Sequence, residues 1–186
     1  MTLKSLSAAE MKDANQIANE TLSLDLGCGE KPKNFFQASK VFGIDVREDL
    51  SKNVVKADLV VSKIPFADET FDFITAHDFI EHIPRVIYTP ERRTPFVELM
   101  NEIWRTLKPG GKFLSQTPAY PQPAAFCDPT HVNIITEQTF SLYFCGEVWA
   151  KGYGFRGKFS LVSQQWNGPH LISVLEKLTT EGAKQA

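Results

Sequence analysis

The sequence predicts an α/β fold: a doubly wound, mostly parallel sheet of about seven strands that ends in an antiparallel hairpin. Short apolar runs suited to buried strands recur between turn-rich and helical segments, which favours parallel pairing. The first run leads directly into a glycine-rich turn, which is typical of sheets that bind nucleosides. The length of 186 residues suits a single domain, residues 1–186, with a sizeable core.

We expect this domain to have three consecutive parts. Residues 1–21 are expected to hold a short helix, because Ser7 and Glu10 have the spacing of a capping box. Residues 22–117 are expected to form a cofactor-binding core. Residues 118–186 are expected to form a substrate-side loop followed by the C-terminal strands.

The first strands are identified from runs of apolar and β-branched residues. They are expected at 22–26, 41–46, 53–61 and 71–76. The connection between the first two strands is too short for a long helix, so we expect only one or two helical turns there.

A long helix is predicted after Thr94, because a threonine N-cap precedes a proline at the first helical position. We expect it to end at residues 108–111, Lys-Pro-Gly-Gly, with a fifth strand following at 112–117. Five apolar residues fall on one face of this helix. They are Phe96, Met100, Ile103, Trp104 and Leu107.

Residues 118–133 are rich in proline and are expected to form a lid, because open α/β sheets bind ligands at the carboxyl edge. A short helix is expected at 136–144, where the aromatic spacing favours core packing. The last two strands are expected at 155–165 and 170–178 as an antiparallel hairpin.

Composition narrows the function classes. Twenty basic and twenty-two acidic residues are scattered along the chain and give a net charge of −2, so nucleic acid is not an expected partner. Three separated cysteines form no CxxC pair, which favours a reducing compartment such as the cytoplasm and predicts no metal site. No apolar run is long enough to span a bilayer, so we expect no membrane association.

The most informative segment is LDLGCG at residues 24–29. Gly27 and Gly29 permit a sharp turn at the end of a buried strand, so that a cofactor can approach bare backbone. A dinucleotide fingerprint would need a third glycine where Pro32 stands, which disfavours NAD. Asp45 follows Asp25 by twenty residues at a strand end, a position from which a carboxylate can accept hydrogen bonds from ribose hydroxyls.

Together these motifs resemble those of a known family. The motifs are LDLGCG at 24–29, GIDV at 43–46, ADL at 57–59, FDFITAHDFIEHI at 71–83 and LKPGG at 107–111. In this order they resemble the class I S-adenosylmethionine (SAM)-dependent methyltransferases, over about residues 22–144. The segment AFCDPTHVNIIT at 125–136 is similar to small bacterial methyltransferases of the type-11 kind. The resemblance implies a Rossmann-like sheet, SAM as cofactor and S-adenosylhomocysteine as product.

The resemblance also implies roles for individual residues. Asp25 would serve the amino group of the cofactor, with stabilisation of the turn as the alternative. Asp58 would meet the adenine amino group beside the Leu59 backbone, with capping of a strand as the alternative. His77 and Asp78 would line the methionine part. Cys28, between the two glycines, is expected to fill space only.

The residues that bind the methyl acceptor are expected to lie on the lid. His131 is the candidate general base, because imidazole titrates near neutrality, and a role in holding the loop is the alternative. Tyr120, Phe126 and Asp128 are the other candidate substrate-binding residues. His82 is expected to be structural. In the ERR run at residues 91–93 the arginines are expected to be solvated, with contact to a phosphate as the alternative.

These features predict a methyltransferase that acts on a hydroxyl or amine of a small-molecule or sugar-type acceptor. The alternative is a SAM-binding accessory subunit without turnover, and a nicotinamide-dependent oxidoreductase is a more distant one. The small size leaves no separate recognition domain, so a partner subunit or a homodimer could complete the acceptor site.

Overall fold

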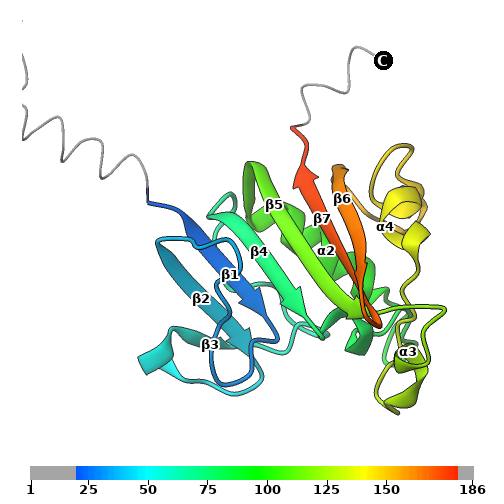
Figure 1. Cartoon of the computed structure of the whole chain (residues 1–186), viewed down its shortest axis with the longest axis horizontal. Helices are drawn as coiled ribbons and strands as arrows, with labels where there is room; N and C mark the ends of the chain where they lie inside the picture. Colours follow the sequence, from blue (N-terminus) through cyan, green and yellow to red (C-terminus); the bar gives the residue numbers. More distant parts are fainter. Residues whose placement is uncertain (1–19, 180–186) are drawn as a thin grey trace, which may run out of the picture.

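A computed structural model describes residues 20–179. Its centre is a seven-stranded sheet in the order β3-β2-β1-β4-β5-β7-β6 (Figure 1). The strands β1 to β5 pair in parallel, whereas β7 runs antiparallel to both β5 and β6. The predicted seven-stranded α/β fold with a C-terminal antiparallel hairpin is confirmed. The helix expected within residues 1–21 lies outside the described residues.

The strand bounds agree with the sequence where apolar runs are continuous. The strands are β1 (Leu22–Leu26), β2 (Lys40–Asp45), β3 (Val54–Lys56), β4 (Phe71–His77), β5 (Leu107–Pro118), β6 (Phe159–Asn167) and β7 (His170–Lys177). Strand β3 is much shorter than predicted, because the chain turns at Asp58, whose carbonyl accepts the N–H groups of Val61 and Ser62.

Three α-helices lie among the described residues. They are α2 (Pro95–Thr106), α3 (Ala124–Cys127) and α4 (Glu137–Tyr143), with 3-10 turns η1 (Leu50–Lys52), η2 (Ile80–His82) and η3 (Trp149–Tyr153). Helix α2 begins with Pro95 as predicted, but it ends at Thr106. The Lys-Pro-Gly-Gly sequence does not stop the helix. It lies inside β5, where the pairing with β4 shifts register and Gly110 has a φ of +74°.

The connection between β1 and β2 contains no helix, contrary to the one or two turns that we expected. An aromatic side chain from this connection covers part of the sheet surface that a helix would otherwise cover. The Phe36 ring stacks on Phe73 of β4 with centroids 4.5 Å apart. The Asn34 side chain bonds both the N–H and the carbonyl of Ala38, which holds this segment in a compact loop.

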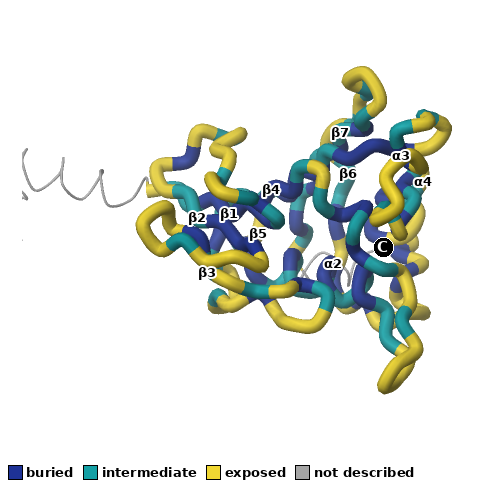
Figure 2. The backbone as a smooth tube through the Cα atoms, turned by 90° about the horizontal axis from the view of Figure 1, so that it is seen from below, coloured by how far each residue is buried: buried dark blue, intermediate teal, exposed yellow. Residues whose placement is uncertain are grey.

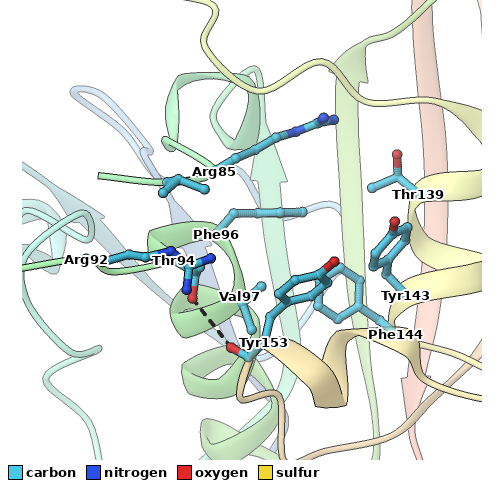
Figure 3. Close-up of a pocket in the computed structure, with 10 residues that line it drawn as sticks. Arg85, Arg92, Thr94, Phe96, Val97, Thr139, Tyr143, Phe144 and Tyr153 are labelled. Atoms are coloured by element: carbon cyan, nitrogen blue, oxygen red, sulfur yellow. Dashed lines mark hydrogen bonds between the residues drawn. The ribbon is translucent and has the colours of Figure 1, made fainter. Parts of the chain in front are cut away.

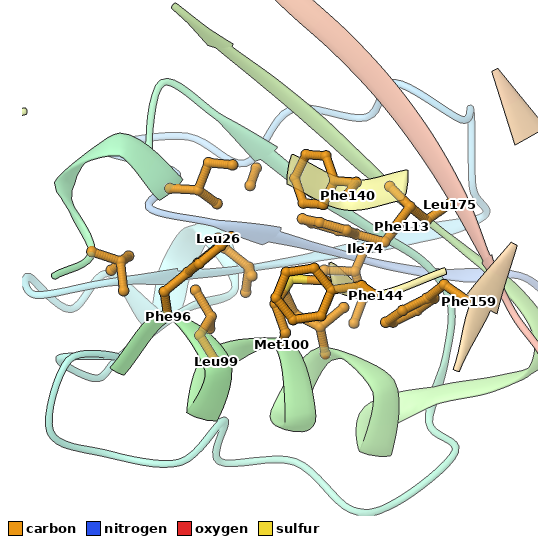
Figure 4. Packing of buried hydrophobic residues seen from close by; sticks show 14 of the residues in the cluster. Leu26, Ile74, Phe96, Leu99, Met100, Phe113, Phe140, Phe144, Phe159 and Leu175 are labelled. Atoms are coloured by element: carbon orange, nitrogen blue, oxygen red, sulfur yellow. The ribbon is translucent and has the colours of Figure 1, made fainter. Parts of the chain in front are cut away.

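The core lies between the sheet and helices α2 and α4, where the backbone is buried (Figures 2 and 4). Leu99 and Met100 project from α2 toward Leu26 and Ile74 of the sheet, and Ile103 of α2 belongs to the same buried cluster. The predicted core packing of the aromatic residues near α4 holds for Phe140 and Phe144, which are buried and whose rings contact Phe96 of α2, but not for Tyr143, which is 37% exposed.

The C-terminal hairpin closes the far side of the sheet. Strand β6 begins at Phe159 and not at Phe155, because Phe155 leaves η3 and packs its ring between Phe144 and Phe159. The Lys177 ammonium is buried and donates to the Leu107 carbonyl at 2.7 Å, which ties β7 to the start of β5. Among residues 20–179, no helix has the length and apolar character required to cross a membrane.

Candidate functional site

The glycine-rich turn lies at the carboxyl end of β1. Gly27 and Gly29 both have a φ of +63°, a conformation that favours glycine. Between them, the Cys28 N–H donates to the Ile44 carbonyl, and burial raises the pKa of the Cys28 thiol to about 11. A buried, protonated thiol fills space, as the sequence suggests.

Asp45 ends strand β2 beside this turn. One carboxylate oxygen accepts a hydrogen bond from the Gly29 N–H at 3.0 Å. The other accepts hydrogen bonds from the backbone N–H and the side-chain Nε–H of Arg47. Burial opposes ionisation of Asp45, but these hydrogen bonds outweigh it and lower the pKa of the carboxyl. Asp45 is therefore an anion at neutral pH, and it lies next to bare glycine backbone.

A cavity of about 270 Å³ opens at this edge of the sheet. Its wall combines the end of β2, the turn after β3 and the segment after β4. The lining residues are Gly27, Ile44, Asp45, Val46, Ala57, Asp58, Leu59, Val60, Phe79, His82 and Ile83. The structure thus brings four predicted cofactor residues, two of them acidic, together in one cavity whose other walls are mainly apolar.

The Phe79 ring packs directly on Gly27, so a Cβ atom at Gly27 would overlap it, whereas a Cβ at Gly29 would meet nothing within 4 Å. Both glycines have the same φ, so alanine costs about 1–2 kcal/mol of backbone strain at either position. Gly27→Ala must also displace Phe79. We expect it to destabilise the protein by about 1–3 kcal/mol more than Gly29→Ala, measured by urea unfolding without cofactor. Equal losses would contradict the packing of Phe79 on Gly27.

Asp25 lies behind the cavity in β1 and is 1% exposed. Its carboxylate accepts the Lys33 N–H at 2.8 Å and the Thr75 hydroxyl at 2.7 Å. Burial raises the pKa of this carboxyl, which these two hydrogen bonds oppose. Asp25 holds the β1–β2 connection against β4, and its contact with the amino group of a cofactor stays a prediction.

His77 ends strand β4, and Asp78 follows it directly. Burial lowers the pKa of His77. Asp78 has a φ of +50°, an uncommon backbone conformation outside glycine that clusters at functional sites. Its carboxylate lies 3.0 Å from Nε2 of His170, at the turn between β6 and β7. His170 is a residue of this edge that the sequence reasoning missed, because its partner is distant in the chain.

The predicted lid brings two aromatic residues together. The rings of Tyr120 and Phe126 meet edge to face with centroids 6.5 Å apart, and each residue is 55% exposed. Tyr120 is anchored through its N–H, which donates to the Ile135 carbonyl at 2.9 Å. An exposed aromatic pair on an anchored loop can cover the apolar face of a ligand.

The lid also carries a polar cluster against η2. Asp128 accepts the Thr130 hydroxyl at 2.6 Å, and Thr130 lies 2.9 Å from Nδ1 of His82. The ring centroids of His82 and His131 are 4.9 Å apart. Glu81 is buried beside them, and burial raises the pKa of its carboxyl. The structure therefore joins His131 and Asp128 to His82, which we expected to be structural.

A second cavity, of about 310 Å³, lies between the start of α2, α4 and η3 (Figure 3). Tyr143 and Tyr153 stack along one wall, and Arg85 and Arg92 lie at its rim. Arg93, in contrast, is paired with Glu98. Of the two arginines in the ERR run, Arg92 lines this cavity, and its contact with a phosphate stays a prediction.

Residues 24–115 match the family model described as "Methyltransferase domain". The chain belongs to the class I SAM-dependent methyltransferases. SAM is accordingly its cofactor, and the matched range includes the glycine turn and Asp45. No curated protein sequence matches the methyltransferase described here.

Solved structures show the same fold at low identity. A SAM-dependent methyltransferase from Archaeoglobus fulgidus is 18% identical (TM-score 0.53), and the match covers 91% of this chain and 92% of that one. The Burkholderia thailandensis 1,6-didemethyltoxoflavin-N1-methyltransferase, with its substrate and S-adenosylhomocysteine bound, is 15% identical (TM-score 0.59; 89% and 74% covered). A chain in a complex with the Haloferax volcanii Trm112 methyltransferase activator is 13% identical (TM-score 0.58; 87% and 84% covered).

Proposed function

We propose that this methyltransferase transfers the methyl group of SAM to a hydroxyl or amine of a small-molecule or sugar-type acceptor. The observation that carries the proposal is the position of His82. This residue lines the cofactor cavity and also contacts Thr130 of the lid. The cofactor edge and the candidate acceptor loop are therefore adjacent.

The cavity residues fit the adenosine half of SAM. We propose that Asp45 accepts the ribose hydroxyls, since its anionic carboxylate faces the glycine turn. Asp58 and the Leu59 backbone would meet adenine, and Gly27 and Gly29 would let the cofactor approach the main chain.

The methionine half would extend toward the end of β4. His77 and Asp78 lie there, and the Asp78 carboxylate is half exposed and available to a positive amino group. Asp25 is buried behind them, so we propose that it acts by holding Lys33 and the glycine turn in place.

The lid fits an acceptor that has both an apolar face and hydroxyl or amine groups. Tyr120 and Phe126 offer exposed aromatic surface, and Asp128 and His131 offer polar atoms a few residues away. Sugars present this combination of C–H faces and hydroxyls. The scattered charges, with a net charge of −2, lack the basic stripe typical of nucleic-acid binders.

Bound SAM supplies a methyl group on a sulfonium, which is already an activated leaving group. The chain's task is to orient the acceptor and exclude water, and orientation alone can contribute about 7–11 kcal/mol. The acceptor atom forms a bond to the methyl carbon as the carbon–sulfur bond breaks, and the acceptor proton must leave. We propose His131 as the residue that takes this proton, which typically contributes about 10²- to 10⁴-fold.

A partner subunit or a second copy of the chain is a further part of the proposal. The polar and aromatic groups of the lid are open to solvent: Tyr120 and Phe126 are more than half exposed. A structural neighbour occurs in a complex with a methyltransferase activator, which supports this part of the proposal.

The first test is a calorimetric titration of the purified chain with SAM, S-adenosylhomocysteine and NAD. We expect binding of the first two alone. A screen with methyl-labelled SAM against sugars, small alcohols and amines, and RNA as a separate arm, then tests the acceptor class. Transfer to RNA only, or SAM-independent binding of NAD, would overturn the proposal.

A further inference from the structure

Three side chains that can bind a metal converge where the lid meets η2. One potential ligand atom each from Glu81, His82 and His131 lies within 4.8 Å of the others. Glu81 is 1% exposed, and the two histidines are half-buried. The ligands are distant in sequence and include no cysteine, so the cysteine spacing could not predict them.

The hydrogen bonds around His82 determine which ring nitrogen is free. The Thr130 hydroxyl donates its proton to the Asp128 carboxylate at 2.6 Å, so its oxygen must accept from Nδ1 of His82 at 2.9 Å. This relay fixes the tautomer with the proton on Nδ1. Nε2 of His82 therefore carries an unprotonated lone pair, the form that binds metals.

His131 is held in the same tautomer. Its Nδ1 lies 3.4 Å from the Ala125 carbonyl, which can only accept a hydrogen bond, so Nδ1 is the donor. Nε2 of His131 is then a second free lone pair. In both histidines Nδ1 is hydrogen-bonded to an oxygen of the protein, the Thr130 hydroxyl for His82 and the Ala125 carbonyl for His131. Such hydrogen bonds are common around metal-binding histidines.

Glu81 supplies a third acceptor. Its Oε2 accepts the Thr117 hydroxyl at 2.8 Å, whereas its Oε1 is buried and has no hydrogen-bond partner among the described residues. A buried carboxylate oxygen without a partner costs free energy, which a cation beside it would offset.

Backbone contacts pre-position these groups. The Glu81 carbonyl accepts the N–H groups of both Val132 and Asn133 at 2.9 Å, and the Asn133 side chain donates to the Ile80 carbonyl. His131 is therefore fixed against η2 by the residues that follow it. Little ordering of the loop would be needed for a ligand to bind.

We propose that Glu81, His82 and His131 bind one divalent transition-metal ion, with Zn²⁺ as the preferred ion. One ligand atom from each of these residues lies within 4.8 Å of the other two, and a single water molecule has only two protons to share among three acceptors. Two imidazoles and one carboxylate match the ligand set of catalytic zinc sites, which keep a further position open. Tetrahedral ligand atoms lie about 3.4 Å apart at bond lengths of about 2.1 Å, so small side-chain shifts would complete the site.

The role of this ion rests on the proposed function. An acceptor hydroxyl at the open position would lose its proton more readily, because zinc lowers the pKa of bound water to about 7. His131 would then be a ligand in the metal-bound enzyme, and the proton of the acceptor hydroxyl would pass to solvent water instead of to His131. The metal site can be tested without SAM or an acceptor, so failure of the proposed function leaves this test intact.

The experiment strips the full-length protein with a chelator and titrates it with ZnCl₂ by calorimetry, and with CoCl₂ by visible absorption. We expect one equivalent to bind. His82→Ala, His131→Ala and Glu81→Gln should each weaken binding by more than about 100-fold. Thr130→Val, which removes only the relay to Asp128, should weaken it about 10- to 100-fold. MgCl₂ should not bind, because Mg²⁺ prefers oxygen ligands.

The matched control is His170→Ala, which removes an imidazole outside the cluster and should leave zinc affinity unchanged. Thermal unfolding by circular dichroism shows which variants are folded, and His131→Ala, on the lid, keeps the test valid if Glu81→Gln does not fold. Stoichiometry below 0.1 equivalent at about 100 µM zinc, or binding unchanged in both folded histidine variants, would overturn the proposal.

Discussion

Asp45→Ala is expected to raise the dissociation constant for SAM by more than about 100-fold while the protein stays folded. The proposed contacts are two hydrogen bonds from ribose hydroxyls to an anion, each worth about 1.5–3 kcal/mol. The carboxylate also holds the Gly29 N–H, so its loss loosens the turn that the cofactor approaches. The measurement is calorimetric titration with SAM, with circular dichroism to confirm the fold.

Asp49→Ala is the matched control. Asp49 lies on the same connection and is ion-paired with Lys52, but it does not line the cofactor cavity. We expect its SAM affinity to stay within about twofold of the parent protein, as for substitutions away from a site. An Asp45→Ala variant that is folded and binds SAM normally would refute the ribose assignment.

Phe140→Ala is expected to lower the free energy of unfolding by about 3–5 kcal/mol, the usual cost of truncating a buried phenylalanine. The residue is 0% exposed, and its ring contacts Phe96 of α2, Phe113 of β5 and Phe144. A single side chain therefore joins α4, α2 and the sheet, and the rigid rings around it cannot collapse fully into the cavity. Urea unfolding followed by tryptophan fluorescence measures the loss.

Leu142→Ala on the same helix separates packing from helix propensity. Leu142 is 36% exposed, so its truncation should cost less than about 1 kcal/mol. Similar losses in the two variants would mean that α4 stability, and not the Phe140 contact, determines the result.

Local sequence predicted most of the fold because each element carries its own pattern. Apolar runs located β1 and β4, and Thr94 with Pro95 located the start of α2. Prediction failed where tertiary contacts decide. The Lys-Pro-Gly-Gly sequence resembles a helix stop, yet it lies within β5, because Leu107 before it pairs with β4 and residues 112–118 after it pair with β4 and β7.

The candidate site shows the same division. Gly27, Asp45 and Asp58 each follow a strand, so their meeting at one sheet edge follows from parallel pairing. Phe79 and His170 were missed, and His82 was expected to be only structural, because each acts through a partner that only the fold brings near. Thr130 contacts His82 across 48 residues, and no spacing rule in a single sequence reveals such a pair.

The contact between the Asp78 carboxylate and Nε2 of His170 links the cofactor edge to the last hairpin, although 92 residues separate the two in the chain. Binding to one part of a cooperative structure stabilises every element that must be in place for binding. If SAM uses Asp78, it will protect the backbone amides of β6 and β7 from hydrogen exchange without touching them. During synthesis the ribosome releases β1 to β4 before β7, so the nascent chain would gain its full affinity for SAM only when the hairpin closes. The cofactor would then act late in folding, because it would bind most tightly to chains in which the whole sheet has formed.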